Sequence, residues 1–268
     1  MNDSPRGGHE PCGITAARLR AQNLVVRCGD KTVLDVADLD LATGVTALTG
    51  ANGAGKSTLL KVFAQLVPLA SGYVTLGAEK VNSDKTRAGY RAAIGYLPQD
   101  PDFPGNFTVE EAITYSAWLR GVPASRRTGA VQRVIGELSL TKWASTRLKN
   151  LSGGNRQRVH IAQTIVHKPL VLLLDEPTTG IDVEHRIGLR KILGKLGNTC
   201  CIVMSTHHTE DIELLADRVV SLREGTVVFQ GTPQELIARA KAQSSSASQP
   251  SREARSIEQA LRDLGGTE

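Results

Sequence analysis

The octapeptide GANGAGKS at residues 50–57 has the spacing G-x-x-x-x-G-K-[ST] of a phosphate-binding loop. Its glycines let the backbone wrap closely around an anion, so that successive N–H groups point at phosphate oxygens. Lys56 would supply a positive charge to the β- and γ-phosphates, and the Ser57 hydroxyl would ligate Mg²⁺. A glycine-rich turn that binds nothing is the alternative, but the apolar stretch before the motif and the helical pattern after it favour the phosphate loop.

Two adjacent carboxylates, Asp175 and Glu176, follow the apolar run 171–174. Such a run is typical of a buried strand, and α/β sheets bind ligands at the carboxyl ends of their strands. Alternation along the strand points the two side chains in different directions. Asp175 therefore suits the Mg²⁺ shell, and Glu176 suits a general base that activates an attacking water. An acidic strand end without a role is the alternative.

A second glycine-containing turn, LSGGNRQR at residues 151–158, also opens a predicted helix. The first N–H groups of a helix have no partners within it, and its dipole attracts anions. The chain thus has two helix starts that are suited to phosphate. One γ-phosphate could use both only if they converge on it.

These motifs lie in a chain that alternates predicted strands and helices. We expect strands at 19–26, 33–41, 45–49, 73–76, 94–97, 170–174, 200–204, 218–222 and 226–230. We expect helices at 56–66, from 108 onward, at 125–138, 152–166, 182–196 and 209–216, and an amphipathic one at 257–264. Thr108 followed by Glu111 predicts a capping box at one of these starts. The alternation indicates a parallel sheet that is covered on both faces.

Composition excludes several classes of protein. The 268 residues are 40% hydrophobic and 22% charged, which suits a globular chain rather than a disordered one. No apolar run approaches the roughly 20 residues of a membrane span, and no apolar segment near residue 1 indicates a secretory signal. None of the four cysteines forms a CxxC pair, so we expect reduced, structural thiols in a cytosolic protein. The net charge of +5 is concentrated in residues 103–150, which face either solvent or an anionic partner.

The motifs together resemble those of the ATP-binding cassette (ABC) ATPases. GANGAGKS resembles the family's Walker A motif, VLLLDE at 171–176 its Walker B motif, and LSGGN at 151–155 its LSGGQ signature. Gln99 matches the Q-loop glutamine, Asp182 the D-loop aspartate and His207 the switch histidine. The resemblance covers roughly residues 19–235 and keeps the family's motif order.

The resemblance implies an α/β fold with a P-loop NTPase core and a mostly parallel sheet. It also implies an antiparallel β-subdomain near the N-terminus and a helical subdomain inserted at about 103–158. We therefore predict an N-terminal tail at 1–18, an ABC ATPase domain at 19–241, and a Ser-rich linker with a short C-terminal helix at 242–268.

Family roles carry over to the matching positions. Catalytic roles fall to Glu176, His207 and Gln99, and Mg²⁺ ligation falls to Ser57, Gln99 and Asp175. The residues expected to contact ATP are Gly50, Asn52, Gly53, Ala54, Gly55, Lys56, Ser57, Thr58, Ser152, Gly153, Gly154 and Asp182. The family's signature binds ATP held by a partner subunit, which implies a head-to-tail dimer with two sites.

Two positions depart from the family pattern. Asn155 replaces the usual glutamine of the signature and keeps the amide. Cys28 occupies the place of an aromatic residue that stacks on adenine in many relatives, and no aromatic residue precedes Phe63. We hypothesise that base contact is weak and that ATP and GTP are poorly distinguished.

The function that these features predict is ATP hydrolysis that powers transport through a separate membrane permease. The expected location is the cytoplasmic face of the membrane, and export is favoured because RSIEQALRDLGG at 255–266 resembles the ending of exporter cassettes. The alternative is an ABC ATPase that acts on nucleic acid or a macromolecular assembly. Chromosome-maintenance members carry a long coiled coil between Walker A and the signature, and the span 57–151 is too short for one. A sensor that binds ATP without turnover is disfavoured because Lys56, Asp175, Glu176 and His207 are all present.

Overall fold

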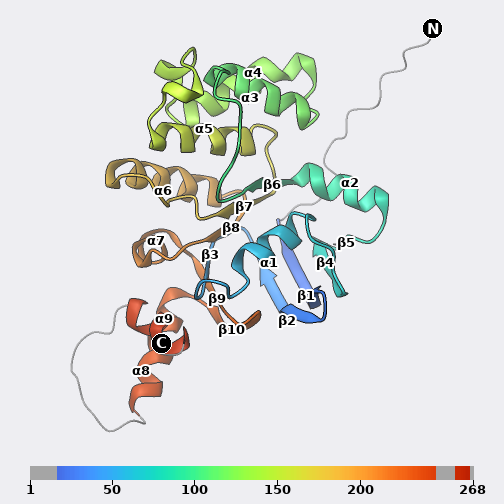
Figure 1. Ribbon diagram of the computed structural model, residues 1–268, viewed down its shortest axis with the longest axis vertical. Helices are drawn as coiled ribbons and strands as arrows, with labels where there is room; N and C mark the ends of the chain where they lie inside the picture. Colours follow the sequence, from blue (N-terminus) through green and yellow to red (C-terminus); the bar gives the residue numbers. More distant parts are fainter. Residues whose placement is uncertain (1–16, 246–256, 266–268) are drawn as a thin grey trace.

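The computed structural model describes residues 17–245 and 257–265, and within them the strands form two sheets (Figure 1). One sheet is antiparallel, in the order β2 (Lys31–Leu41), β1 (Leu19–Cys28), β4 (Ser71–Leu76) and β5 (Glu79–Lys80). The other has the order β10 (Thr226–Gly231), β9 (Arg218–Arg223), β3 (Gly44–Thr49), β8 (Cys201–Ser205), β7 (Val171–Asp175) and β6 (Ile94–Leu97). All neighbours in this second sheet are parallel except β9 and β10. The predicted α/β fold with a mostly parallel sheet is therefore confirmed.

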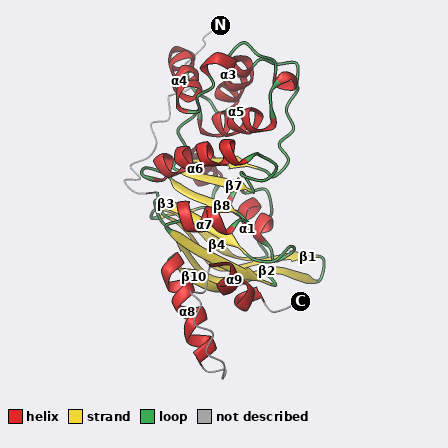
Figure 2. Ribbon diagram, turned by 90° about the vertical axis from the view of Figure 1, so that its left-hand side faces the viewer, coloured by secondary structure: helices red, strands yellow, loops and turns green. Residues whose placement is uncertain are grey.

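Helices cover both faces of the parallel sheet. The described helices are α1 (Lys56–Phe63), α2 (Asp84–Ala93), α3 (Val109–Leu119), α4 (Ala124–Glu137), α5 (Gly153–Ile165), α6 (Val183–Gly197), α7 (Thr209–Leu215), α8 (Pro233–Ser245) and α9 (Ile257–Gly265). Short 3-10 turns at Thr141–Trp143 and Leu148–Asn150 join α4 to α5. Figure 2 shows α3, α4 and α5 together beyond α6, away from the strands. The predicted capping box begins α3, where Thr108 Oγ1 accepts from the N–H of Glu111 at 3.2 Å.

The strand β7 separates two hydrophobic cores, because its side chains alternate between faces. Val171 and Leu173 pack in a core with α1 and the antiparallel sheet. Leu172 and Leu174 pack in the core that contains α5 and α6. The helix after Walker A and the helix after the signature therefore lie on opposite faces of the parallel sheet.

The structure corrects expectations about both ends of the chain and adds helices that were not predicted. Of the expected tail 1–18, the described residues Ala17 and Arg18 are ordered against the sheet, with Ala17 buried and Arg18 paired to Asp40. The segment 242–268, expected to start as a linker, instead begins inside α8, which extends to Ser245, and residues 246–256 lie outside the described part. The helices α2 and α8 were not predicted.

The C-terminal helix α9 is packed rather than solvated. Ile257 and Ala260 are almost fully buried, in a core with α7, α8 and β9. Arg223 of β9 also donates a hydrogen bond to the carbonyl of Leu264 at 3.3 Å. None of the helices in the described part of the chain combines the length and apolar character that crossing a bilayer demands.

Candidate functional site

The Walker A loop connects β3 to α1 and is shaped by left-handed glycines. Gly50 has φ +141°, and a Cβ there would lie 2.3 Å from the carbonyl oxygen of Leu222, so this position requires glycine. Gly53 and Gly55 also have positive φ, at +81° and +102°. Residues 51–53 are exposed, whereas Ala54 is buried and its carbonyl accepts from the N–H of Gly225 at 3.0 Å. The loop is thus fixed on one side and open on the other.

The ammonium of Lys56 is held inside this loop by its own backbone. Its Nζ donates to the carbonyls of Gly50 and Ala51, at 2.7 and 3.0 Å. Burial lowers the pKa of Lys56, while the nearby carboxylates Glu176 and Asp175 act in the opposite direction. Ser57 and Thr58 follow in the first turn of α1, both half-buried. The arrangement places one cation and the first N–H groups of a helix at the same opening.

Asp175 and Glu176 meet the Walker A serine through a short hydrogen-bond network. The Ser57 hydroxyl donates to Asp175 Oδ1 at 3.2 Å, and the Ser205 hydroxyl donates to the same oxygen at 2.7 Å. The backbone N–H of Glu176 in turn donates to Ser205 Oγ at 2.8 Å. Asp175 is buried, and Glu176 has φ +50°, a conformation that non-glycine residues adopt at some cost and that recurs at functional sites.

His207 lies beside the carboxylate of Glu176. Its Nδ1 is 3.4 Å from Glu176 Oε2, which also accepts a hydrogen bond from Thr179 Oγ1 at 3.0 Å. The imidazole is half exposed and lies against the ring of His208, with centroids 4.1 Å apart and ring planes tilted by 40°. The structure therefore brings together Lys56, Ser57, Asp175, Glu176 and His207.

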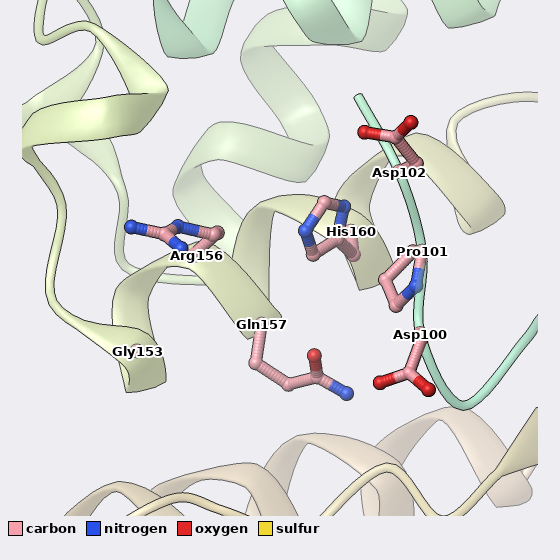
Figure 3. A pocket seen from close by; sticks show the side chains of 7 residues that line it. All are labelled: Asp100, Pro101, Asp102, Gly153, Arg156, Gln157 and His160. Atoms are coloured by element: carbon pink, nitrogen blue, oxygen red, sulfur yellow. The ribbon is translucent and has the colours of Figure 1, made fainter. Parts of the chain in front are cut away.

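Gln99 is not joined to this group by a hydrogen bond among the described residues. It is exposed and follows β6, whose Leu97 lies opposite Leu174 of β7. The segment after it borders a cavity of about 310 Å³ on the first turns of α5 (Figure 3). The residues that line this cavity are Asp100, Pro101, Asp102, Gly153, Arg156, Gln157 and His160. The segment that follows Gln99 thus faces the signature helix across this cavity.

The signature turn and the D-loop form a second group, on the α5 and α6 face. Ser152 caps α5, and its Oγ accepts from the N–H of Asn155 at 3.4 Å. Asp182 caps α6 in the same way, and both cap residues are exposed. A Cβ at Gly154 would lie 2.4 Å from the ring of His185, so the first turns of the two helices touch. Ser152, Gly153, Gly154 and Asp182 therefore lie together, across the sheet from Walker A.

Sequence reasoning missed two side chains that position the first group. Ser205 bridges Asp175 and the backbone of Glu176, as described above. Asp211 is buried and accepts hydrogen bonds from Thr178 and Thr206, at 2.6 and 3.0 Å, so it ties together the loops that follow β7 and β8. The only sequence feature that could have pointed to Ser205 is its position at the end of an apolar strand, two residues before His207. No comparable feature of the sequence marks Asp211.

A phosphate loop, a carboxylate-ended strand and a facing histidine on a parallel sheet define a nucleotide-hydrolysing P-loop protein. The family model described as ABC transporter matches residues 34–179, more than half of the chain. The chain therefore belongs to the ABC transporter family, as one of its ATP-binding, ATP-hydrolysing subunits.

Known proteins resemble the chain over most of its length. The ferric enterobactin transport ATP-binding protein FepC of Escherichia coli is 33% identical, over 83% of this chain and 84% of its own. The petrobactin import ATP-binding protein FpuD of Bacillus anthracis is 31% identical, over 82% of each chain. The structure of cbiO1 from Clostridium perfringens, part of the ABC transporter complex cbiONQ, superposes with a TM-score of 0.73 at 28% identity, covering 87% of this chain and 96% of that one. These names give no support to the export direction expected above.

Proposed function

We propose that this chain binds and hydrolyses ATP to power transport through a membrane subunit on a separate chain. The observation that carries the proposal is the continuous network from Ser57 through Asp175 and Ser205 to Glu176, with His207 beside it. Each part of ATP hydrolysis then has a candidate residue at one opening of the sheet. The family membership supports the same assignment.

The chain's own residues bind the triphosphate in this proposal. The exposed N–H groups of residues 51–53 and the start of α1 receive phosphate oxygens, and Lys56 exchanges its two carbonyl partners for the β- and γ-phosphates. Asn52 and Thr58 flank this contact. Ser57 and Asp175 offer a hydroxyl and a carboxylate oxygen 3.2 Å apart, and oxygen ligands are the ones that Mg²⁺ prefers. Bound there, Mg²⁺ would neutralise charge on the phosphates, with Gln99 as a further oxygen ligand.

Glu176 is the general base in this mechanism. It accepts a proton from water as the water oxygen attacks the γ-phosphorus and the bond from that phosphorus to the bridging oxygen of ADP breaks. Its carboxylate is oriented by Thr179 and His207, and its backbone by Ser205. His207 donates a hydrogen bond to the γ-phosphate from an imidazole that is half exposed at the opening.

The complete site needs two copies of the cassette, either identical or from a related chain. Walker A and the signature lie on opposite faces of the parallel sheet in one chain, as the two cores of β7 indicate. One triphosphate therefore contacts both only if Ser152, Gly153, Gly154 and Asp182 come from the partner subunit. ATP then favours the closed dimer, because it makes more contacts there than in the open state.

A single substitution tests the enzymatic part of the proposal. Glu176→Gln keeps the size of the side chain and removes its basicity, so turnover should fall by at least about 100-fold, the range of general-base catalysis. ATP binding should persist and trap a dimer. Lys56→Ala is the matched comparison, because it should weaken ATP binding itself. Hydrolysis that persists in Glu176→Gln would remove Glu176 from its role.

The transport part is tested by its partner and by its direction. We infer a permease partner at the inner face of the membrane and an import direction, which the names of FepC and FpuD support. Purification of this chain from membranes should recover an integral membrane protein with it. Deletion of the chain should abolish uptake of an iron chelate of the kind named for these relatives, ferric enterobactin or petrobactin. Recovery of nucleic acid without a membrane protein would favour the alternative ATPase class, and efflux that depends on this chain would reverse the direction.

A further inference from the structure

His185, in the first turn of α6, connects the two helix starts of the signature group. Its Nδ1 lies 2.8 Å from both carboxylate oxygens of Asp182. The backbone N–H of His185 also donates to Asp182 Oδ1 at 2.9 Å. The side chain of Asp182 is 63% exposed, whereas that of His185 is only 24% exposed. The imidazole therefore lies further inward than the carboxylate of Asp182, which caps this helix.

The inward face of the imidazole lies directly on the signature. A Cβ built at Gly154 would approach Cγ, Cδ2 and Cβ of His185 at 2.4, 2.5 and 2.8 Å. These distances leave no room for a side chain at position 154, so the ring of His185 occupies the space where that side chain would lie. The backbone of Gly154 is therefore held against a ring that is itself held by Asp182.

We propose that His185 is a positioning residue that couples the D-loop carboxylate to the signature turn of the same chain. It fixes the N–H groups at the start of α5 relative to Asp182, so that both are presented together to the triphosphate held by the partner subunit. This role rests on the dimeric site proposed above. His185 itself touches no substrate in it.

A second contact, between α5 and the segment before α6, limits the loss of activity that we expect when His185 is replaced. Gln157 of α5 donates from Nε2 to the carbonyl of Pro177 at 3.0 Å, in the segment that follows Glu176. Loss of His185 would leave this link in place, so α5 should remain docked while its first turn becomes less well fixed. We expect a loss of about tenfold in turnover, the order of one hydrogen bond to a charged group.

The test separates the two contacts of the imidazole. His185→Phe keeps a ring on Gly154 but loses the hydrogen bond to Asp182. His185→Asn keeps a donor near the Nδ1 position but loses the ring. His185→Ala loses both contacts. Lys195→Ala, an exposed position in the last turn of the same helix, is the matched control. The measurements are kcat and KM for ATP, melting temperature, the ATP affinity of the monomer, and ATP-driven dimerisation in the Glu176→Gln background.

The expected result is a loss confined to the dimer. His185→Ala should lower kcat about tenfold and weaken ATP-driven dimerisation, while monomer ATP affinity and melting temperature match those of Lys195→Ala. His185→Phe and His185→Asn should each recover part of the loss. Unchanged kcat and dimerisation in His185→Ala would overturn the proposal, and so would an equal loss of ATP affinity in the monomer. Absence of a dimer in the Glu176→Gln parent would instead overturn the dimeric site itself, and this role with it.

Discussion

The buried carboxylate of Asp211 should be a main determinant of stability around the site. It accepts from Thr178 and Thr206 at 2.6 and 3.0 Å, and from Arg190 Nε at 2.6 Å. The side chain of Asp211 is 0% exposed and that of Arg190 is 9% exposed. Arg190 also pairs with Glu210, at 3.0 Å, but the Glu210 side chain is 64% exposed. One guanidinium thus has a buried partner and an exposed one.

Substitution of the two partners should have very different effects. Removal of one member of a buried ion pair costs about 3–5 kcal/mol, because the other charge is left without compensation. We expect the lower end, about 3 kcal/mol, for Asp211→Ala, since Glu210 still neutralises part of the charge. Glu210→Ala should cost at most about 1 kcal/mol, as exposed pairs do.

Thermal unfolding distinguishes these cases. Each kcal/mol lowers the melting temperature of a domain of 150–250 residues by about 2–4 °C, so Asp211→Ala should melt roughly 6–12 °C lower and Glu210→Ala within about 4 °C of the parent. Urea unfolding should give the same order of effects. Equal decreases in melting temperature for the two variants would refute the reasoning. They would show that the buried Asp211–Arg190 pair contributes no more stability than the exposed Glu210–Arg190 pair.

Four further outcomes are expected. Ser205→Ala should lower kcat more than ATP affinity, measured by steady-state kinetics and nucleotide titration, because Ser205 orients Glu176 and Asp175 rather than the Walker A loop. Gly50→Ala should abolish ATP binding in a nucleotide titration, since its Cβ would lie 2.3 Å from a backbone oxygen. Burial and the nearby Arg120 charge lower the pKa of His167 to about 4, so the unfolded chain binds its proton first. Stability should therefore fall as pH drops from about 6.5 to 4, and His167→Gln should weaken that dependence in urea titrations across this range. Cys28 is exposed at the end of β1, so a tyrosine there has room to stack on the base. Cys28→Tyr should therefore tighten ATP binding by up to about 3 kcal/mol. Unchanged affinity in a nucleotide titration would contradict the hypothesis.

The motifs could be located from the sequence because their requirements are local. The Walker A loop needs glycine at Gly50 for backbone reasons that the spacing already encodes, and the structure shows the same requirement at the carbonyl of Leu222. The strands could be located because runs such as 171–174 are apolar throughout, which indicates burial on both faces. Boundaries moved by a few residues where tertiary contacts decided them. Helix α1, for example, ends at Phe63 rather than at residue 66, and Gln65 adopts φ +57°.

Other features depend on contacts that no local pattern encodes. Asp211 and Ser205 acquire their roles from loops far away in the chain, and His185 acquires its role from a glycine 31 positions earlier. The packing of α9 likewise depends on β9 and α7, which complete its apolar face. An amphipathic segment predicts a helix, but it does not say whether a protein surface covers it.

The separation of Walker A from the signature follows from the register of a single strand. Side chains in a strand alternate with a period of two, so Val171 and Leu173 face α1 while Leu172 and Leu174 face α5 and α6. Both helix starts present free N–H groups, yet the sheet stands between them, and β7 is fully buried on both faces. Within one chain the sheet keeps the two helix starts apart, and in the dimer proposed above a second copy would supply the missing one. The ATP dependence of dimerisation in Glu176→Gln therefore tests whether a second copy completes the site.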